Sequence, residues 1–347
     1  MKRVHIGHHF FGAGNLGDDF MLAGFFAALG SRASRAAFTC CVPHPWEPLA
    51  RRFPQVDWRP YDEDSRRRSI EACDLWLGLG GSPFQSAVSS WFSDHLERET
   101  RLCAAARKPM YFLGVGGQDP AAYRVPALRA AARQAEAIWT RDPGTAEALR
   151  ALVPTSVRAG ADLAHAFFEA NPPPKTQPGR LCAVLNFDFA PWPGLPSALE
   201  ALAAIPASER VWIAQEARNL PGAERALYSA VSETEKARWR LHAVDIPGST
   251  AAAALANWPG GEWVLSSRYH ATLVAAWAGS RVAVLATNTK LSSAAQECGY
   301  PEMPLSGDPA ALPGLLTAAS PPQRSILLSR AALARRSCAE FAQAAGL

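Results

Sequence analysis

Short apolar runs alternate with alanine-rich segments of helical period along the chain. Strands of a parallel sheet are buried on both faces, so they appear as continuous runs of Val, Ile, Leu and aromatic residues, and crossover helices separate them. The pattern predicts two series of strands. The first series covers residues 4–10, 37–42, 75–79, 110–115 and 137–140, and the second covers 181–187, 211–215, 240–244, 263–266 and 282–286.

Helices of the expected period separate the second series, at 197–204, 223–231, 250–257 and 271–278, and a long one ends the chain at 323–345. Between the two series lies a proline-rich stretch, 171–179, which favours neither a helix nor a central strand. We therefore predict an α/β chain with two Rossmann-like, doubly wound domains. The N-terminal domain covers 1–170, a linker covers 171–180, and the C-terminal domain covers 181–347, with its last helix packing back on the first domain.

Ligands of doubly wound domains collect at the carboxyl ends of the strands. Two such domains joined by a linker predict an interdomain cleft, with the two sheets contributing their carboxyl edges. We therefore expect ligand-binding and catalytic residues in the segments that follow the predicted strands.

Composition narrows the class of protein. The 347 residues are 48% hydrophobic and 19% charged, which fits two buried cores and excludes disorder. A formal net charge of +4 provides no basic field for nucleic acid. The seven scattered cysteines have no metal-ligand spacing and indicate reduced thiols. Without a signal peptide or an 18-residue apolar run, we expect a cytoplasmic protein, at most peripheral at the inner face of a membrane.

The first candidate segment is the glycine-rich turn after the first strand, Gly12-Ala13-Gly14-Asn15-Leu16-Gly17-Asp18-Asp19, which leads into a helical pattern from Phe20. Its backbone N–H groups suit an anion or a sugar at a helix start. The spacing is not that of a dinucleotide motif, and Asp18 and Asp19 would repel a pyrophosphate. The alternative is a strand-to-helix turn capped by Asn15 or Asp18.

Two further glycine turns end predicted strands: Gly78-Leu79-Gly80-Gly81-Ser82 and Gly114-Val115-Gly116-Gly117. Glycines here permit close approach of a ligand to the backbone, or they are ordinary turn residues. Arg141 follows another strand, and its guanidinium suits a carboxylate or phosphate. The alternative for Arg141 is a local pair with Asp142 or a solvated position.

The strongest candidate is the segment Ser267-Arg268-Tyr269-His270, where a buried strand enters a helix. Helix N–H groups, a guanidinium and an imidazole there offer an anion site with a proton carrier. Lys290 follows the next strand and supplies a second cation to the same edge. His8 and His9 end the first predicted strand, and His44, His95, His165 and His242 have no companion group, so core or surface positions are expected for these four.

The ordered motifs of the chain resemble those of the polysaccharide pyruvyl transferase family. The resemblance rests on Gly14-Asn15-Leu16-Gly17-Asp18-Asp19, Gly78-Leu79-Gly80-Gly81, Gly114-Val115-Gly116-Gly117, Arg141-Asp142, Asp162-Leu163-Ala164 and Ser267-Arg268-Tyr269-His270. It implies the GT-B arrangement of two Rossmann-like domains, and transfer of the pyruvyl group of phosphoenolpyruvate to two hydroxyls of a saccharide as a cyclic ketal, in exopolysaccharide or cell-wall polysaccharide biosynthesis. Departures are Ser82, where many members carry glycine, and Gln118-Asp119, where a Gly-Pro pair is common.

The resemblance also implies site roles. Arg268 and Arg141 hold the donor's carboxylate and phosphate, with Ser267 and Lys290 beside them, and His270 is the general acid. The saccharide acceptor, free or lipid-linked, is expected to contact Asn15, Asp18, Asp19, Gly80, Gly81, Gly116 and Gly117. Phosphoenolpyruvate is a co-substrate, and no cofactor or metal is implied.

Aromatic residues in two loops, Phe84, Trp91, Phe187, Phe189 and Trp192, suit either sugar stacking or the core. Two other functions fit the same fold. One is a GT-B nucleotide-sugar glycosyltransferase, and the other is a non-catalytic sugar-binding protein.

Overall fold

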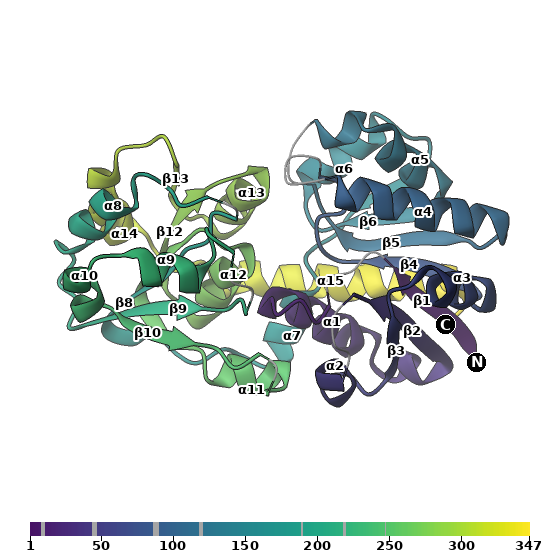
Figure 1. Cartoon of the computed structure of the whole chain (residues 1–347), viewed down its shortest axis with the longest axis horizontal. Helices are drawn as coiled ribbons and strands as arrows, with labels where there is room; N and C mark the ends of the chain where they lie inside the picture. Colours follow the sequence, from purple (N-terminus) through teal and green to yellow (C-terminus); the bar gives the residue numbers. More distant parts are fainter. Residues whose placement is uncertain are drawn as a thin grey trace. The chain divides into compact units, whose positions relative to one another are not determined.

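The computed structural model describes residues 1–7, 11–43, 47–85, 90–117, 121–188, 190–217, 220–246 and 248–347. Two compact units divide the chain. Unit 1 contains Met1–Ala13, Asp18–Ala170 and Ser329–Leu347, and unit 2 contains Gly14–Gly17 and Asn171–Leu328. Each unit is built on its own parallel sheet flanked by helices (Figure 1).

The sheet of unit 1 has the strand order β3-β2-β1-β4-β5-β6-β7 in the described ranges. Every residue of β4 and β5 is buried, as expected for strands covered on both faces. The strand order reverses between β1 and β4, which is the switch point where ligands of doubly wound sheets bind. The strands are β1 (Lys2–Gly7), β2 (Ala36–Val42), β3 (Val56–Pro60), β4 (Leu75–Leu79), β5 (Met110–Val115), β6 (Ala135–Thr140) and β7 (Ser156–Ala159).

The helices of this half of the chain begin at local signals. Asp62 caps α3 by accepting a hydrogen bond from the backbone N–H of Ser65, and Asp142 caps α6 through Thr145 in the same way. The helices are α1 (Leu16–Leu29), α2 (Glu47–Arg52), α3 (Glu63–Ala72), α4 (Trp91–Ala105), α5 (Pro126–Gln134), α6 (Pro143–Arg150) and α7 (Ala164–Ala170), with 3₁₀ helices at Gly30–Arg35 and Ala122–Arg124.

The sheet of unit 2 has the order β10-β9-β8-β11-β12-β13 in the part of the chain that the structure describes. Its switch point lies between β8 and β11. The strands are β8 (Gln177–Val184), β9 (Glu209–Ala214), β10 (Arg240–Ala243), β11 (Gly261–Ser266), β12 (Arg281–Ala286) and β13 (Glu302–Pro304). The helices are α8 (Leu195–Leu202), α9 (Glu224–Ala230), α10 (Glu233–Arg238), α11 (Ala251–Ala256), α12 (Tyr269–Ala278), α13 (Thr289–Cys298) and α14 (Leu312–Ala318), with a 3₁₀ helix at Pro309–Ala311.

The last helix, α15 (Arg324–Ala345), starts in unit 2 and belongs to unit 1 from Ser329 onward. Cys338, Phe341 and Ala342 are fully buried in the core cluster that contains β1 and β2 of unit 1. No helix within the described ranges is long and apolar enough to cross a bilayer. All seven cysteines are buried thiols.

The predicted α/β fold class is confirmed, and the predicted strands 75–79 and 110–115 match β4 and β5. The sequence pattern missed β3, β7 and β13, which lie at sheet edges. These strands are short and part-exposed, so they lack the continuous apolar run of a central strand. The last three residues of the predicted strand 4–10 lie outside the described residues.

Three predicted boundaries were wrong. The linker was expected to reach residue 180, but β8 begins at Gln177, because this exposed residue already pairs with Gly261 of β11. The helix α1 begins at Leu16 instead of Phe20. The helix α12 begins at Tyr269, before the predicted start at residue 271. His270 therefore lies in its first turn, and Ser267 and Arg268 precede it.

Candidate functional site

Ser267 links the exits of two adjacent strands of unit 2. Its hydroxyl donates to the backbone carbonyl of Asn186 at 2.9 Å and accepts from the backbone N–H of the same residue at 2.7 Å. Its own N–H donates to Val184 at 3.0 Å. Ser267 therefore holds the segment after β8 against the end of β11, at the switch point of the sheet.

Arg268 lies between two buried carboxylates. Its Nη2 is 2.5 Å from Oε2 of Glu216, and its Nε is 3.0 Å from Oε1 of Glu224. Glu216 and Glu224 are 1% and 0% exposed. Burial acts to lower the pKa of Arg268, but the charges of Glu224 and Glu216 raise it above its ordinary value. The guanidinium therefore stays charged, and much of its charge is balanced inside the protein.

The two carboxylates were not among the predicted site residues. Burial raises the pKa of Glu224, and Arg268 opposes this rise. Asn186 also donates to Oε2 of Glu216 at 3.1 Å. A signal was available in the sequence, because Glu216 follows a predicted strand and Glu224 begins a predicted helix. What the sequence did not show is that both groups converge on Arg268.

The Asn15 segment, Gly14–Gly17, belongs to unit 2 and pairs with the exit of β9. Asn15 forms an antiparallel bridge with Glu216. Leu16 N–H donates to Gln215 at 3.2 Å, and Ala217 N–H donates to Gly14 at 2.7 Å. The Arg268 Nη2 group donates to Oδ1 of Asn15 at 3.4 Å. Two motifs about 250 residues apart in the sequence are thus brought into contact.

His270 lies against Gly17 of the same segment. A Cβ atom at Gly17 would lie 2.1 Å from Nδ1 of His270, closer than any side chain tolerates. Gly17 does not have a positive φ, so this close approach explains the glycine. His270 is 8% exposed, and its ring meets that of Tyr269 edge-on at 5.1 Å.

Replacing Gly17 with alanine is expected to lower the free energy of unfolding by about 1–3 kcal/mol, because the methyl group overpacks against His270. The matched control is Gly314→Ala in α14, where a Cβ meets no atom within 4 Å. The control is expected to gain about 0.5–1 kcal/mol, as glycine is a poor helix residue. Urea unfolding of the wild type and the two variants measures both changes. An equal gain in the free energy of unfolding for Gly17→Ala and Gly314→Ala would contradict the contact between Gly17 and His270.

Lys290 lies in the first turn of α13, after β12, which neighbours β11 in the sheet. Asn288 caps this helix by accepting from Leu291 N–H at 3.2 Å. Lys290 is half-buried. Asn186, Glu216, Arg268 and Lys290 therefore all follow strands at the carboxyl edge of the unit 2 sheet.

In unit 1, Arg141 is only 2% exposed and binds the two glycine turns. Its Nη1 donates to the carbonyl of Gly81 at 3.3 Å, and its Nη2 donates to Ser82 Oγ at 3.0 Å and to the carbonyl of Gly117 at 3.5 Å. A Cβ at Gly116 would lie 2.3 Å from Nε of Arg141. Arg141 thus holds these turns together through their carbonyl groups.

The other predicted acceptor residues of unit 1 lie on the turns and on α1. Gly80 and Gly81 have positive φ angles of 65° and 71°, which only glycine adopts without strain. Asp18 is half-buried in the first turn of α1. Asp19 is buried, and its Oδ2 is 3.0 Å from Nη2 of Arg52. Burial raises the pKa of Asp19 to about 6, although Arg52 lowers it.

Because the pKa of Asp19 is raised in the folded state, its contribution to stability is present at low pH and is lost as pH rises through about 6. Two pKa units correspond to about 3 kcal/mol. At each pH, the free energy of unfolding of Asp19→Asn is subtracted from that of the wild type. We expect this difference to fall by about 3 kcal/mol between pH 4 and pH 7.5. Urea unfolding across this range measures the difference, and a pH-independent difference would refute the assignment.

The predicted sugar-stacking residues occupy different environments. Phe84 and Trp192 are core residues, 1% and 6% exposed. Phe187 is half-buried and packs on Trp192 with ring centroids 5.8 Å apart. Trp91 is half-buried and stacks parallel to the ring of His95. Phe189, like His8, His9 and His44, lies outside the described residues.

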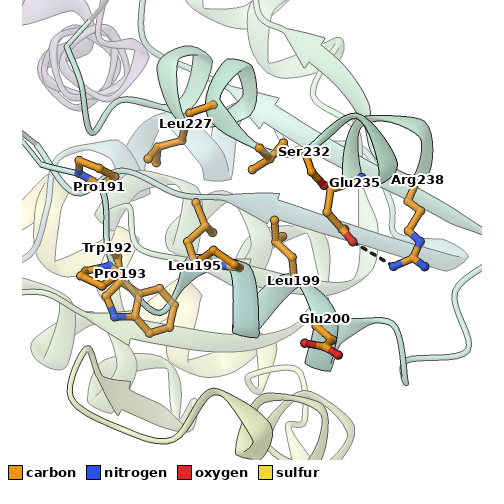
Figure 2. A pocket seen from close by; sticks show the side chains of 13 residues that line it. Pro191, Trp192, Pro193, Leu195, Leu199, Glu200, Leu227, Ser232, Glu235 and Arg238 are labelled. Atoms are coloured by element: carbon orange, nitrogen blue, oxygen red, sulfur yellow. Dashed lines mark hydrogen bonds and ion pairs between the residues drawn. The ribbon is translucent and has the colours of Figure 1, made fainter.

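A pocket of about 620 Å³ opens in unit 2 between α8, α9 and α10 (Figure 2). Its charged lining residues are Glu200, Glu235 and Arg238, and the last two form an ion pair of 2.9 Å. No cation remains in this lining to hold a diphosphate, so the pocket does not suit the phosphates of a nucleotide sugar. In the described part of the chain, no cluster of His, Cys, Asp or Glu has the arrangement of a metal site.

Solved structures similar to this chain have GT-B-like folds. HepE from Anabaena, solved in complex with UDP, has a TM-score of 0.57 at 12% identity, covering 99% of this chain and 95% of that one. MnaA from S. aureus with UDP has a TM-score of 0.60 at 10% identity, covering 98% and 95%. Sucrose-phosphate synthase from Thermosynechococcus elongatus has a TM-score of 0.53 at 14% identity, covering 99% and 94%.

At these identities the likeness establishes the fold alone, which is the α/β two-domain Rossmann-like architecture of the GT-B folds. No curated protein matches the sequence. The sequence model of one family does match, over residues 15–289, and this stretch contains Asn15, Gly17 and the Ser267-to-His270 segment. On that match, the chain belongs to the polysaccharide pyruvyl transferase family.

Proposed function

We propose that this protein transfers the pyruvyl group of phosphoenolpyruvate to two hydroxyls of one saccharide, giving a cyclic ketal and free phosphate. The observation that carries the proposal is the contact between the two most specific motifs. Asn15 binds Arg268, and Gly17 lies against His270, at the carboxyl edge of the unit 2 sheet. Membership of the family supports a transferase that acts on a saccharide.

The donor is proposed to bind at the start of α12. Phosphoenolpyruvate has a carboxylate and a phosphate on a small frame, so it needs cations and N–H donors close together. The N-terminus of α12, Arg268 and Lys290 provide these groups on adjacent strands of one sheet. Glu216 and Glu224 fix the guanidinium of Arg268 and balance its positive charge. We therefore assign Lys290 and the helix N-terminus a larger share of the donor's charge.

The chemistry assigns His270 a proton-transfer role. Protonation of C3 of the enol ester generates an electrophilic C2, which one sugar hydroxyl attacks as it loses its proton. The C2–O bond to phosphate then breaks, and the second hydroxyl adds to C2, loses its proton to the released phosphate and closes the ketal. Each turnover thus forms two C–O bonds and releases one phosphate. Histidine titrates near neutral pH, so it both gives and accepts a proton in such a sequence.

The acceptor is proposed to contact the turns of unit 1 and the start of α1. Asp18, one residue after Gly17, and Asp19 are the proposed partners of the sugar hydroxyls, alongside Asn15 and the turns of Gly80, Gly81, Gly116 and Gly117. The resemblance implies a donor contact for Arg141. Because its guanidinium binds the carbonyls of Gly81 and Gly117, we propose that it acts by positioning these turns.

The proposal is tested with two donors and a panel of acceptors. The protein is incubated with phosphoenolpyruvate or with UDP-glucose, and with p-nitrophenyl hexosides that carry free hydroxyl pairs. We expect phosphate release from phosphoenolpyruvate, and an acceptor whose mass increases by pyruvate minus water. Binding of UDP-glucose by calorimetry, with none of phosphoenolpyruvate, would replace the proposal by a nucleotide-sugar glycosyltransferase. Binding of the hexosides without turnover of either donor would favour a sugar-binding protein.

A further inference from the structure

The pocket on the helical face of unit 2 has a wall chemistry that differs from that of the proposed pyruvyl transfer site. Figure 2 shows leucine side chains of α8 facing Leu227 of α9 across it, with Trp192 at one end. Its apolar lining consists of Pro191, Trp192, Pro193, Leu195, Pro196, Leu199, Leu227, Ala230 and Val231. At about 620 Å³, its volume is that of a site for a small organic molecule.

The apolar lining of this pocket presents hydrocarbon side chains and almost no free hydrogen-bonding groups. The indole N–H of Trp192 is already used, because it donates to the carbonyl of Leu305 at 2.9 Å. Pro191 and Pro193, on either side of Trp192, restrict the backbone that carries the indole. A sugar or a nucleotide base, with polar groups around its ring, would leave those groups unsatisfied here.

The polar groups lie at one side and carry a net negative charge. Glu200 and Glu235 bring two carboxylates, and Arg238 brings one guanidinium, which is paired with Glu235 at 2.9 Å. The Oε2 atom of Glu235 is buried without a hydrogen-bond donor among the described residues. Ser232 accepts from the N–H of Glu235 at 3.3 Å. Because two carboxylates face one guanidinium, the charged groups of the rim offer a surplus of hydrogen-bond acceptors.

We propose that this pocket binds a small amphiphile, with an apolar chain against Trp192, Leu199 and Leu227 and a hydrogen-bond-donating head group, an ammonium or a hydroxyl, against Glu235. The carboxylates exclude an anionic head group by repulsion. The apolar chain supplies the affinity, because its burial removes hydrocarbon from water. This binding activity is independent of the proposed pyruvyl transfer, because none of the residues assigned to that reaction lines the pocket.

Three ligands with the same ten-carbon chain and different head groups test whether the pocket selects hydrogen-bond donors over anions. Decylamine, decanol and decanoate are titrated into the full-length protein, each below the concentration at which it aggregates, and binding is followed by calorimetry. We expect saturable binding of the amine and the alcohol, and binding of decanoate weaker by at least about tenfold. Glu235→Gln is expected to weaken the amine more than the alcohol, because it removes a charge but keeps an acceptor.

The site itself is tested by filling it. Ala230 is an exposed residue at the end of α9 in the pocket wall, so Ala230→Trp blocks the pocket without overpacking the core. The matched control is Ala204→Trp, at an exposed alanine outside the lining. Loss of decylamine and decanol binding in the first variant alone supports the proposal, with unchanged thermal unfolding as the folding control. Equal binding of all three ligands, binding that survives Ala230→Trp, or no binding of any ligand would each overturn it.

Discussion

Replacing His270 with alanine is expected to lower the rate of phosphate release from phosphoenolpyruvate by about 10²–10⁴-fold, the usual contribution of one general acid or base. The imidazole is the proposed proton carrier, and it lies in the first turn of α12 against Gly17. The affinity for phosphoenolpyruvate is expected to change less than the rate, because the donor's charges are assigned to other groups. Stopped-time phosphate assays and calorimetry measure the two quantities separately.

The control for this variant is a second histidine outside the site. His242→Gln, in the edge strand β10, is expected to retain the wild-type rate. His270→Gln keeps a polar side chain of similar reach but has no group that titrates near neutral pH, so it is expected to lose activity like the alanine variant. Activity within tenfold of the wild type in His270→Ala would remove this residue from the proposed chemistry.

Replacing Arg268 with alanine is expected to lower the free energy of unfolding by about 3–5 kcal/mol, because Glu216 and Glu224 would remain buried without a counter-ion. This loss of stability is expected to depend on pH. Burial already raises the pKa of Glu224, and without Arg268 this pKa rises further, so stability is lost as pH increases through it. The deficit should therefore be larger at pH 8 than at pH 5, as measured by urea unfolding.

The role of Arg268 in donor binding is separated from this structural role by changing its partners. In the triple variant Arg268→Ala, Glu216→Gln, Glu224→Gln, the buried charges are gone, and much of the lost stability should return. The double variant Glu216→Gln, Glu224→Gln keeps the guanidinium without its carboxylates. If Arg268 contacts the donor, the double variant binds phosphoenolpyruvate more tightly than the triple variant. Equal affinity would limit Arg268 to holding Asn15 and the exit of β9.

Much of the fold could be predicted because its central strands are buried on both faces. The segment 75–79, with the sequence Leu-Trp-Leu-Gly-Leu, is apolar at each position except its glycine, and it forms β4 over the same residues. The edge strand β7 could not be found in this way. Ser156 and Arg158 are exposed and Val157 is buried, so β7 has no continuous apolar run. Its short sequence therefore resembles that of a loop.

The candidate site was predicted in part. The motif order indicated the family. It also selected the loop after β1 and the start of α12 as candidate segments, which remains a prediction. The family resemblance implied the same role, donor binding, for Arg141 and Arg268. In the structure their surroundings differ, as Arg141 binds carbonyl groups of glycine turns and Arg268 binds two carboxylates.

By itself, the sequence determined the two parallel sheets, the positions of the loops at their carboxyl edges and the kinds of side chain that those loops carry. These features follow from local periodicity and from motifs of adjacent residues. Only the tertiary structure decided which groups meet. Arg268 and Glu216 are 52 positions apart, and Asn15 is 253 positions from Arg268. Pairing, burial and the resulting pKa shifts depend on distances in space, which residues so far apart in the chain acquire only when the sheet assembles.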